Sequence, residues 1–242
     1  MLQDRGSGGG KVFLIGGGPG AADLVTLRGA RAIARSDIVI WGRPLVTEEL
    51  VREHSRPDAE IIAWPPATMA DLEAAYDRAA QERLTIARLH GGDPAVYARL
   101  AEEIERVASR GLEVEVIPGV TAACAAAAAL GWELTSEADR RPLVMASAQA
   151  PDGGVADMLQ RGASGGHALA VYMLRSSGAE LQQALLEGGY PPGTACAIGN
   201  RVSWPGEVLD RCSLEELGER LQDLGVEGST VVLIAATAAT GV

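Results

Sequence analysis

The residues that could do chemistry are densest in the stretch Arg88-Leu-His-Gly-Gly-Asp-Pro-Ala-Val-Tyr97. This stretch ends an apolar run and precedes a helix-like pattern, so its two glycines mark the carboxyl end of a predicted strand. Open α/β sheets bind ligands at that edge. Paired glycines let a ligand approach the main chain, Asp93 supplies a carboxylate and His90 an imidazole. Taken alone, the motif is also typical of an ordinary turn that starts a helix.

A second glycine loop, Gly16-Gly-Gly-Pro-Gly20, follows the apolar run 11–15. Gly16-x-Gly18-x-x-Ala21 satisfies a relaxed dinucleotide fingerprint, which makes an NAD-dependent oxidoreductase an alternative. That fingerprint also requires an acidic residue at the end of the second strand to bind the ribose. The chain has Trp41-Gly-Arg-Pro44 there, and Asp37 lies at the opposite end of the strand. The sequence therefore disfavours NAD.

The first 118 residues alternate between apolar runs and helical patterns, as expected for a doubly wound, mostly parallel sheet. Thr47 is predicted to cap the second helix. The predicted strands are 11–15, 37–41, 61–64, 84–89 and 113–117, and the predicted helices are 24–35, 47–54, 71–83 and 97–110.

Pro118-Gly119 ends this alternation, and an alanine-dense helix over 121–130 follows. Some of the later strands follow one another without a helix between them, which predicts a mixed sheet. We therefore expect an α/β protein with a flexible lead over residues 1–10, a first domain over 11–118 and a second over 119–242. The strands predicted in the second domain are 143–147, 167–174, 194–198, 207–210 and 229–235, with helices over 178–187 and 214–224.

Composition excludes several classes of protein. The formal net charge of −11 argues against a broad nucleic-acid surface. No apolar run reaches the roughly 20 residues of a membrane span, and no apolar signal segment opens the chain, so a cytoplasmic protein is expected. Cys124, Cys196 and Cys212 lack metal-ligand spacing, so no metal site is predicted.

Arginine dominates the basic residues, because Lys11 is the single lysine among 21 lysines and arginines. Arginine binds carboxylates through two parallel hydrogen bonds, so arginines around a pocket could hold a polycarboxylate substrate. A codon bias that favours arginine everywhere is the alternative.

Taken together, several segments resemble one family, the tetrapyrrole (corrin and sirohaem) C-methyltransferases, which use S-adenosylmethionine. They occur in the family's order and spacing and cover about residues 11–235. The matching segments are Ile15-Gly-Gly-Gly-Pro-Gly-Ala-Ala-Asp-Leu-Val-Thr-Leu-Arg-Gly29, Arg88-Leu-His-Gly-Gly-Asp-Pro94, Val116-Ile-Pro-Gly-Val-Thr-Ala122, Tyr172-Met173 and Ser203-Trp-Pro-Gly-Glu207.

Within the family, the precorrin-4 C11-methyltransferases are the branch that the chain resembles most. His90, Tyr97, the segment 64–72 and the Ser203–Glu207 element carry that likeness. Tyr172-Met173 and Arg43 look more like the uroporphyrinogen III methylases.

Three departures from the family pattern lie where the macrocycle would be handled. Ala21-Ala22 replaces an Asp-Pro, Trp41-Gly-Arg-Pro-Leu45 replaces a Tyr-Ala-Gly-Ser-Leu run, and Ala146-Ser147 replaces a Thr-Arg. A sister methylation site, a diverged substrate and a relative that binds the cofactor without turnover therefore stay open as alternatives.

The resemblance also implies the site residues. It implies that S-adenosylmethionine binds between the two domains and that the protein is a homodimer, with which the apolar run 231–236 is compatible. It implies a weak base for the ring proton, for which Asp93, His90 or a bound water is the candidate. The implied cofactor-binding residues are Pro19, Gly91, Gly92, Asp93, Val96, Thr121, Ala122, Met173, Val202 and Thr230, and the candidates for binding the substrate are Arg28, Arg43, Tyr97 and Arg175.

Overall fold

The structure is a computed structural model that describes residues 9–138, 140–148, 165–172, 178–225 and 229–236. The chain divides into two compact units, Met1–Thr121 and Ala122–Val242, and each is described by itself. The sequence predicts the boundary after residue 118, and the division in the structure lies between Thr121 and Ala122.

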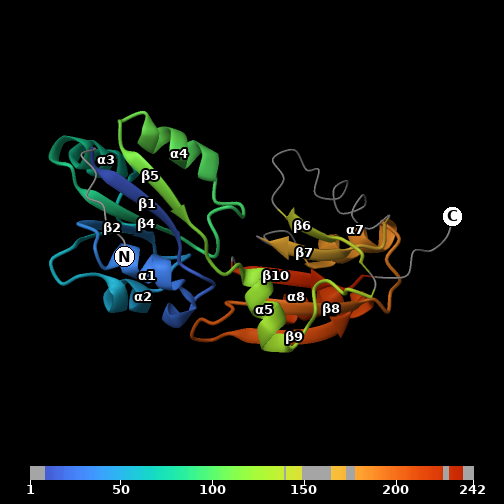
Figure 1. The fold of residues 1–242 in the computed structure, drawn as a ribbon. Helices are drawn as coiled ribbons and strands as arrows, with labels where there is room; N and C mark the ends of the chain where they lie inside the picture. Colours follow the sequence, from blue (N-terminus) through green and yellow to red (C-terminus); the bar gives the residue numbers. More distant parts are fainter. Residues whose placement is uncertain (1–8, 139, 149–164, 173–177, 226–228, 237–242) are drawn as a thin grey trace. The chain divides into compact units, whose positions relative to one another are not determined.

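The first unit is built on a parallel sheet in the order β3-β2-β4-β1-β5 (Figure 1). This confirms the predicted parallel α/β fold of the first half. The strands are β1 (Lys11–Gly16), β2 (Ile38–Gly42), β3 (Glu60–Trp64), β4 (Thr85–His90) and β5 (Glu113–Ile117).

Helices cover both faces of this sheet, as a doubly wound fold requires. On one face lie α1 (Leu27–Ile33) and α2 (Glu48–His54), and on the other lie α3 (Met69–Glu82) and α4 (Leu100–Ala108) (Figure 1). Each face has its own apolar core, and alternate residues of the central strands point into one core or the other.

The helix ends show how well the sequence defines them. Thr47 caps α2 as predicted, by accepting a hydrogen bond from the Leu50 amide. The prediction of a helix from residue 97 is wrong, because α4 begins at Leu100. Tyr97 and Arg99 have positive φ angles of 55° and 54°, which a right-handed helix excludes.

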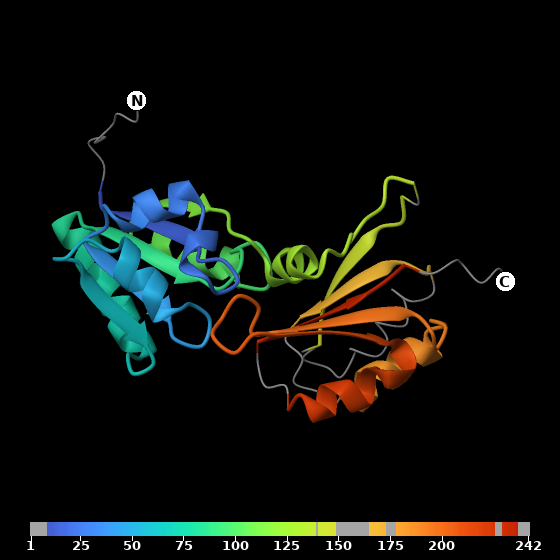
Figure 2. The same cartoon turned by 90° about the horizontal axis from the view of Figure 1, so that it is seen from below.

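The second unit contains a mixed sheet, as predicted, and the structure gives its strand order as β6-β7-β10-β8-β9. β6 and β7 are parallel, and the other pairs are antiparallel. The helices α7 (Gly178–Glu187) and α8 (Leu217–Asp223) cover one face (Figure 2), and α5 (Ala122–Leu130) packs against β8 and β10. The strands are β6 (Leu143–Ser147), β7 (Ala168–Tyr172), β8 (Ala195–Asn200), β9 (Val208–Ser213) and β10 (Thr230–Ile234), and 3₁₀ turns occupy η1 (Ala22–Leu24) and η2 (Leu214–Glu216).

The strand order of the first sheet locates its ligand-binding edge. From β1 the chain crosses to β2 on one side, and from β4 it crosses to β5 on the other side. Neighbouring parallel strands whose connections diverge leave a crevice at their carboxyl ends, where such sheets bind ligands. The two glycine loops of the sequence lie at this switch point. Among the described residues, no helix is long and apolar enough to cross a membrane.

Candidate functional site

The turns after β1 and β4 are joined to each other by main-chain hydrogen bonds. The Gly92 amide donates to the Gly18 carbonyl at 2.7 Å, and the Gly18 amide donates back to Gly92 at 3.2 Å. A third bond of 2.8 Å runs from the Gly17 amide to the His90 carbonyl. Gly18 and Gly92 have φ angles of 77° and 66°, a conformation that glycine adopts without steric cost. The two loops therefore form one double turn.

The turn after β5 packs so closely on this double turn that two further positions require glycine. A Cβ on Gly16 would lie 2.5 Å from the Gly119 amide nitrogen, and a Cβ on Gly119 would overlap the Gly92 carbonyl oxygen. These obstacles are main-chain atoms, which cannot rotate away. The glycines that the sequence singles out are thus explained first by packing between turns.

Asp93 fastens the third turn to the second. Its Oδ1 accepts a hydrogen bond from the Ala95 amide at 2.7 Å, and its Oδ2 accepts one from the Gly119 amide at 2.9 Å. Hydrogen bonds from amides to a carboxylate are among the stronger ones in proteins. Because both oxygens bind main-chain amides, the geometry suits a residue that joins two turns better than a residue that accepts a proton from a substrate.

His90 lies directly before the turn and is 8% exposed. Its Nε2 is buried and has no hydrogen-bond partner among the described residues. Burial, and to a lesser extent the nearby Arg88 guanidinium, lower the pKa of His90 to about 4, although Glu103 acts in the opposite direction. The imidazole is therefore neutral at pH 7.

Thr47, the cap of α2, and His54 in α2 contact the main chain of the loop after β1. The Thr47 hydroxyl donates to the Gly20 carbonyl at 2.9 Å, and His54 Nε2 lies 3.3 Å from the Ala22 carbonyl oxygen. Pro19 is buried in this loop, whereas Asp23 is exposed. The loop thus has fixed support although Ala21-Ala22 stands where the family has an Asp-Pro.

The surface that a ligand could reach lies on the turns after β4 and β5. Gly91, Gly92, Asp93, Val96 and Thr121 are all half-buried. Gly91 and Gly92 present main chain without side chains there, which is the kind of surface that a ligand with many polar atoms requires. The residues present therefore fit the adenosyl cofactor that the resemblance implies.

The second unit brings two of its candidate residues to one end of its sheet. Thr230 begins β10, and Val202 follows the end of the neighbouring β8. Both are 4% exposed. Val202 packs over Gly199, because a Cβ added to Gly199 would lie 2.8 Å from the Val202 side chain. The Thr230 hydroxyl is 3.4 Å from Asn200 Oδ1. Ala122 is half-buried at the start of α5. Met173 and Arg175 lie outside the described residues.

The candidate substrate residues of the first unit are exposed, and they lie on three different elements. Arg43 follows β2, where its Nε donates to the Pro65 carbonyl at 3.0 Å and its guanidinium lies 5.3 Å from the Trp41 ring. Arg28 is exposed on α1, and Tyr97 is exposed in the loop before α4. Partial burial raises the pKa of the Tyr97 phenol above its usual value.

The geometry disfavours NAD more strongly than the sequence does. Asp37 lies at the amino end of β2, where its carboxylate accepts a 2.7 Å hydrogen bond from the Thr85 amide and pairs with Arg56 at 3.1 Å. The glycine loop leads into the 3₁₀ turn 22–24 and reaches α1 only after Thr26. A helix amino terminus directly after the loop, which binds the pyrophosphate in dinucleotide folds, is therefore lacking here. Within the described residues, no group of His, Cys, Asp and Glu side chains could hold a metal ion.

Sequence reasoning missed two features that support this site. The hydrogen bond between Gly119 and Asp93 joins residues that are 26 positions apart in the chain, so no local sequence pattern indicates it. The buried carboxylate of Glu103 was also missed, although an arginine inside the apolar run 84–89 signals that an acidic partner is needed.

Comparisons with known proteins give one consistent result. The sequence matches the family described as Tetrapyrrole (Corrin/Porphyrin) Methylases over residues 11–218. A precorrin-4 C(11)-methyltransferase from a Sinorhizobium species is 34% identical, and the alignment covers 92% of this chain and 88% of the relative.

Solved structures agree with the sequence comparison. A cobalt precorrin-4 methyltransferase superimposes with a TM-score of 0.84 at 26% identity, over 93% of this chain and 94% of that chain. A uroporphyrin-III C-methyltransferase from Thermus thermophilus, in complex with S-adenosylhomocysteine, superimposes with a TM-score of 0.75 at 27% identity, over 93% and 97% of the two chains.

Proposed function

The chain belongs to the tetrapyrrole (corrin/porphyrin) methylase family, and we propose that it methylates C11 of a precorrin-4-type macrocycle in corrin (cobalamin) biosynthesis. S-adenosylmethionine is the methyl donor and S-adenosylhomocysteine the product. We choose C11 because the chain is similar to precorrin-4 methyltransferases in both sequence and structure. Uroporphyrinogen III methylation is the second candidate, because a solved enzyme of that activity also matches over nearly the whole chain.

The cofactor supplies an activated methyl group on a sulfonium, so neither a covalent nucleophile nor a metal is needed. The protein has to hold the two partners in line and to exclude water. We assign the first task to the main chain of Gly91, Gly92 and Asp93, fixed by the double turn with Gly18. Val96 and Thr121 in the first unit, and Ala122, Met173, Val202 and Thr230 in the second, complete the proposed cofactor set, with Pro19 at its edge.

The proton that leaves the ring carbon needs only a weak acceptor. Asp93 is engaged by two amides and His90 Nε2 is buried, so we propose bound water for this role. Arg28, Arg43, Tyr97 and Arg175 remain the proposed contacts of the substrate, with the arginines facing its acetate and propionate groups.

A mass spectrum of the product tests the function. The purified protein is incubated with precorrin-4 and S-adenosylmethionine carrying a labelled methyl group, and uroporphyrinogen III serves as the parallel substrate. We expect one labelled methyl group on precorrin-4 and slower or no transfer to uroporphyrinogen III. Transfer to uroporphyrinogen III alone would move the protein to the second candidate, and transfer to neither would contradict both.

Calorimetric titration tests the cofactor separately. We expect binding of S-adenosylhomocysteine and no binding of NAD or NADP, because β2 lacks the acidic residue that holds the ribose. Binding of NAD without binding of S-adenosylhomocysteine would overturn the assignment.

We further propose that the enzyme is a cytoplasmic homodimer. The three cysteines are free thiols in the structure, which fits a reducing compartment. Light scattering at micromolar concentration should give twice the chain mass of 25.1 kDa. A monomer mass would contradict the dimer.

A further inference from the structure

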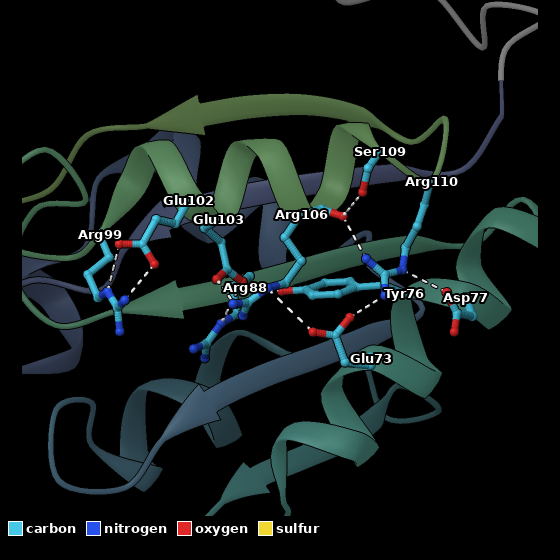
Figure 3. A network of polar contacts seen from close by, with 10 residues as sticks. All are labelled: Glu73, Tyr76, Asp77, Arg88, Arg99, Glu102, Glu103, Arg106, Ser109 and Arg110. Atoms are coloured by element: carbon cyan, nitrogen blue, oxygen red, sulfur yellow. Dashed lines mark hydrogen bonds and ion pairs between the residues drawn. The ribbon is translucent and has the colours of Figure 1, made fainter.

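A network of charged side chains is built into the first unit between β4, α3 and α4 (Figure 3). At its centre is Glu103 of α4, which is 8% exposed. Tyr76 of α3 donates its hydroxyl to Glu103 Oε1 at 2.5 Å, and Arg88 of β4 places its Nε 3.5 Å from the same oxygen. Arg106 lies 3.4 Å from the other oxygen of Glu103.

The network becomes more exposed away from β4. Arg106 also pairs with Glu73 at 3.4 Å, and Arg110 pairs with Glu73 and with Asp77. The Asp77 side chain is 55% exposed, whereas the Glu103 side chain is 10% exposed. Ion pairs in solvent contribute little to stability, so the buried end of the network is the part that needs an explanation.

Apolar residues would serve stability at least as well at the buried end. The neighbours of Arg88 in the sheet are Leu14 on β1 and Ile40 on β2, and both are fully buried. Tyr76, which is also fully buried, belongs to the same apolar core. Desolvation of two charges costs several kcal/mol, and apolar replacement of a buried pair is often neutral or stabilising. A role in positioning explains the pair better than a role in stability.

The place of Arg88 on β4 shows what could be positioned. β4 lies between β2 and β1, and its carboxyl end leads into the double turn. Arg88 and His90 are two residues apart on this strand, so their side chains lie on the same face. The charges that act on His90 are Arg88 of its own strand and Glu103 of α4.

We propose that Arg88 and Glu103 form a positioning unit for the ligand-binding turn: Glu103 holds Arg88, and Arg88 fixes the end of β4 that carries His90 and Gly91–Asp93. The test below uses S-adenosylhomocysteine as the ligand, and that choice rests on the proposed function. Neither residue belongs to the proposed cofactor set, so both would act through the turn.

The triple variant Y76F/R88M/E103L tests this unit, because it replaces the pair by apolar side chains of similar length and also removes the buried Tyr76 hydroxyl, which would otherwise lose its acceptor. We expect a urea midpoint close to that of the unmodified protein and an affinity for S-adenosylhomocysteine about tenfold lower. D77N is the matched control, since it weakens the exposed end of the same network and should leave the affinity unchanged. Wild-type affinity in Y76F/R88M/E103L would overturn the proposal.

A second readout needs no ligand. In R88M, Glu103 keeps Tyr76 and Arg106 as partners, so folding is expected. The titration midpoint of His90, followed by NMR of labelled histidine, should rise, and R88K should restore it toward the original value. An unchanged midpoint in folded R88M would overturn the positioning unit. By contrast, unmodified protein that binds no S-adenosylhomocysteine would overturn the proposed function, so the two failures can be distinguished.

Discussion

Asp93 illustrates how geometry separates two roles for one carboxylate. Each of its oxygens accepts a main-chain amide, and the pair of bonds ties the Gly91–Asp93 turn to Gly119. A base would need an oxygen directed at the substrate. We therefore expect the effect of substitution to fall on binding and stability rather than on the chemical step.

In D93N, one amide N–H of the protein faces an NH₂ group that cannot accept its hydrogen bond. An unsatisfied donor of this kind costs about 1–3 kcal/mol, so the urea midpoint should fall and S-adenosylhomocysteine should bind more weakly. We expect kcat at saturating substrates to stay within about tenfold of the original value. A loss of about a thousandfold or more in kcat with unchanged binding would instead identify Asp93 as the base.

Gly119 tests the close packing of the turns. In G119A the new methyl group would overlap the Gly92 carbonyl oxygen, so one turn must move. Overpacking of this kind typically costs about 1–3 kcal/mol, and the displaced turn should also lose cofactor affinity. G193A is the control, because that glycine is exposed and a Cβ there meets nothing within 4 Å. Equal urea midpoints and affinities for G119A and the original protein would show that the turns are loosely packed.

His90 predicts how stability depends on pH. Its pKa in the folded protein is about 4, below the ordinary value of 6.5, so the unfolded chain binds the extra proton between these values. The contribution to stability is complete above pH 6.5 and is lost as the pH falls toward 4. It amounts to roughly 3 kcal/mol.

The variant H90N should lack this part of the acid dependence. Urea unfolding at several pH values between 7 and 4 measures it for both proteins. Parallel curves for the two proteins would show that His90 is not protonated on unfolding in this range.

At the scale of elements, α2 supports the loop after β1 through a single threonine with two functions. Thr47 accepts the amide of Leu50 as a helix cap and donates its hydroxyl to the Gly20 carbonyl. T47V keeps the shape of the side chain but removes both hydrogen bonds. We expect a loss of about 2 kcal/mol, of which the cap accounts for about half.

T68V is the matched control, because Thr68 caps α3 in the same way but holds no loop. It should lose stability without losing affinity for S-adenosylhomocysteine, whereas T47V should lose both. Equal affinities in the two variants would mean that the position of the loop does not depend on α2.

Elements with a strong local signal were predictable from the sequence. Continuous apolar runs defined the strands of the first sheet, and Thr47 with two following glutamates defined the start of α2. The start of α4 was misplaced because Tyr97 and Arg99 adopt positive φ angles, which are uncommon for residues other than glycine and which the sequence does not signal. Contacts between distant segments, such as Asp93 with Gly119, carry no periodicity, so only the folded chain reveals them.

At the scale of the whole molecule, many arginines are used in structural pairs. Arg56, Arg88, Arg106 and Arg110 each bind at least one acidic side chain of the first unit. The abundance of arginine alone therefore does not indicate a site for polycarboxylates, and the net charge of −11 opposes one. Arg28 and Arg43 are exposed, and they would have to attract a polycarboxylate against this negative net charge.

The balance between local arginines and net charge can be measured through ionic strength. A protein of charge −11 and a polycarboxylate macrocycle repel each other over the Debye length, which falls from about 30 Å at 10 mM salt to about 10 Å at 0.1 M. If net charge dominates, KM for the macrocycle should fall severalfold over this range. The affinity for S-adenosylhomocysteine, which carries little net charge, should stay constant and serves as the internal control. A KM that rises with salt would show instead that arginines such as Arg28 and Arg43 attract the substrate locally, and in that case R43A should remove part of the rise.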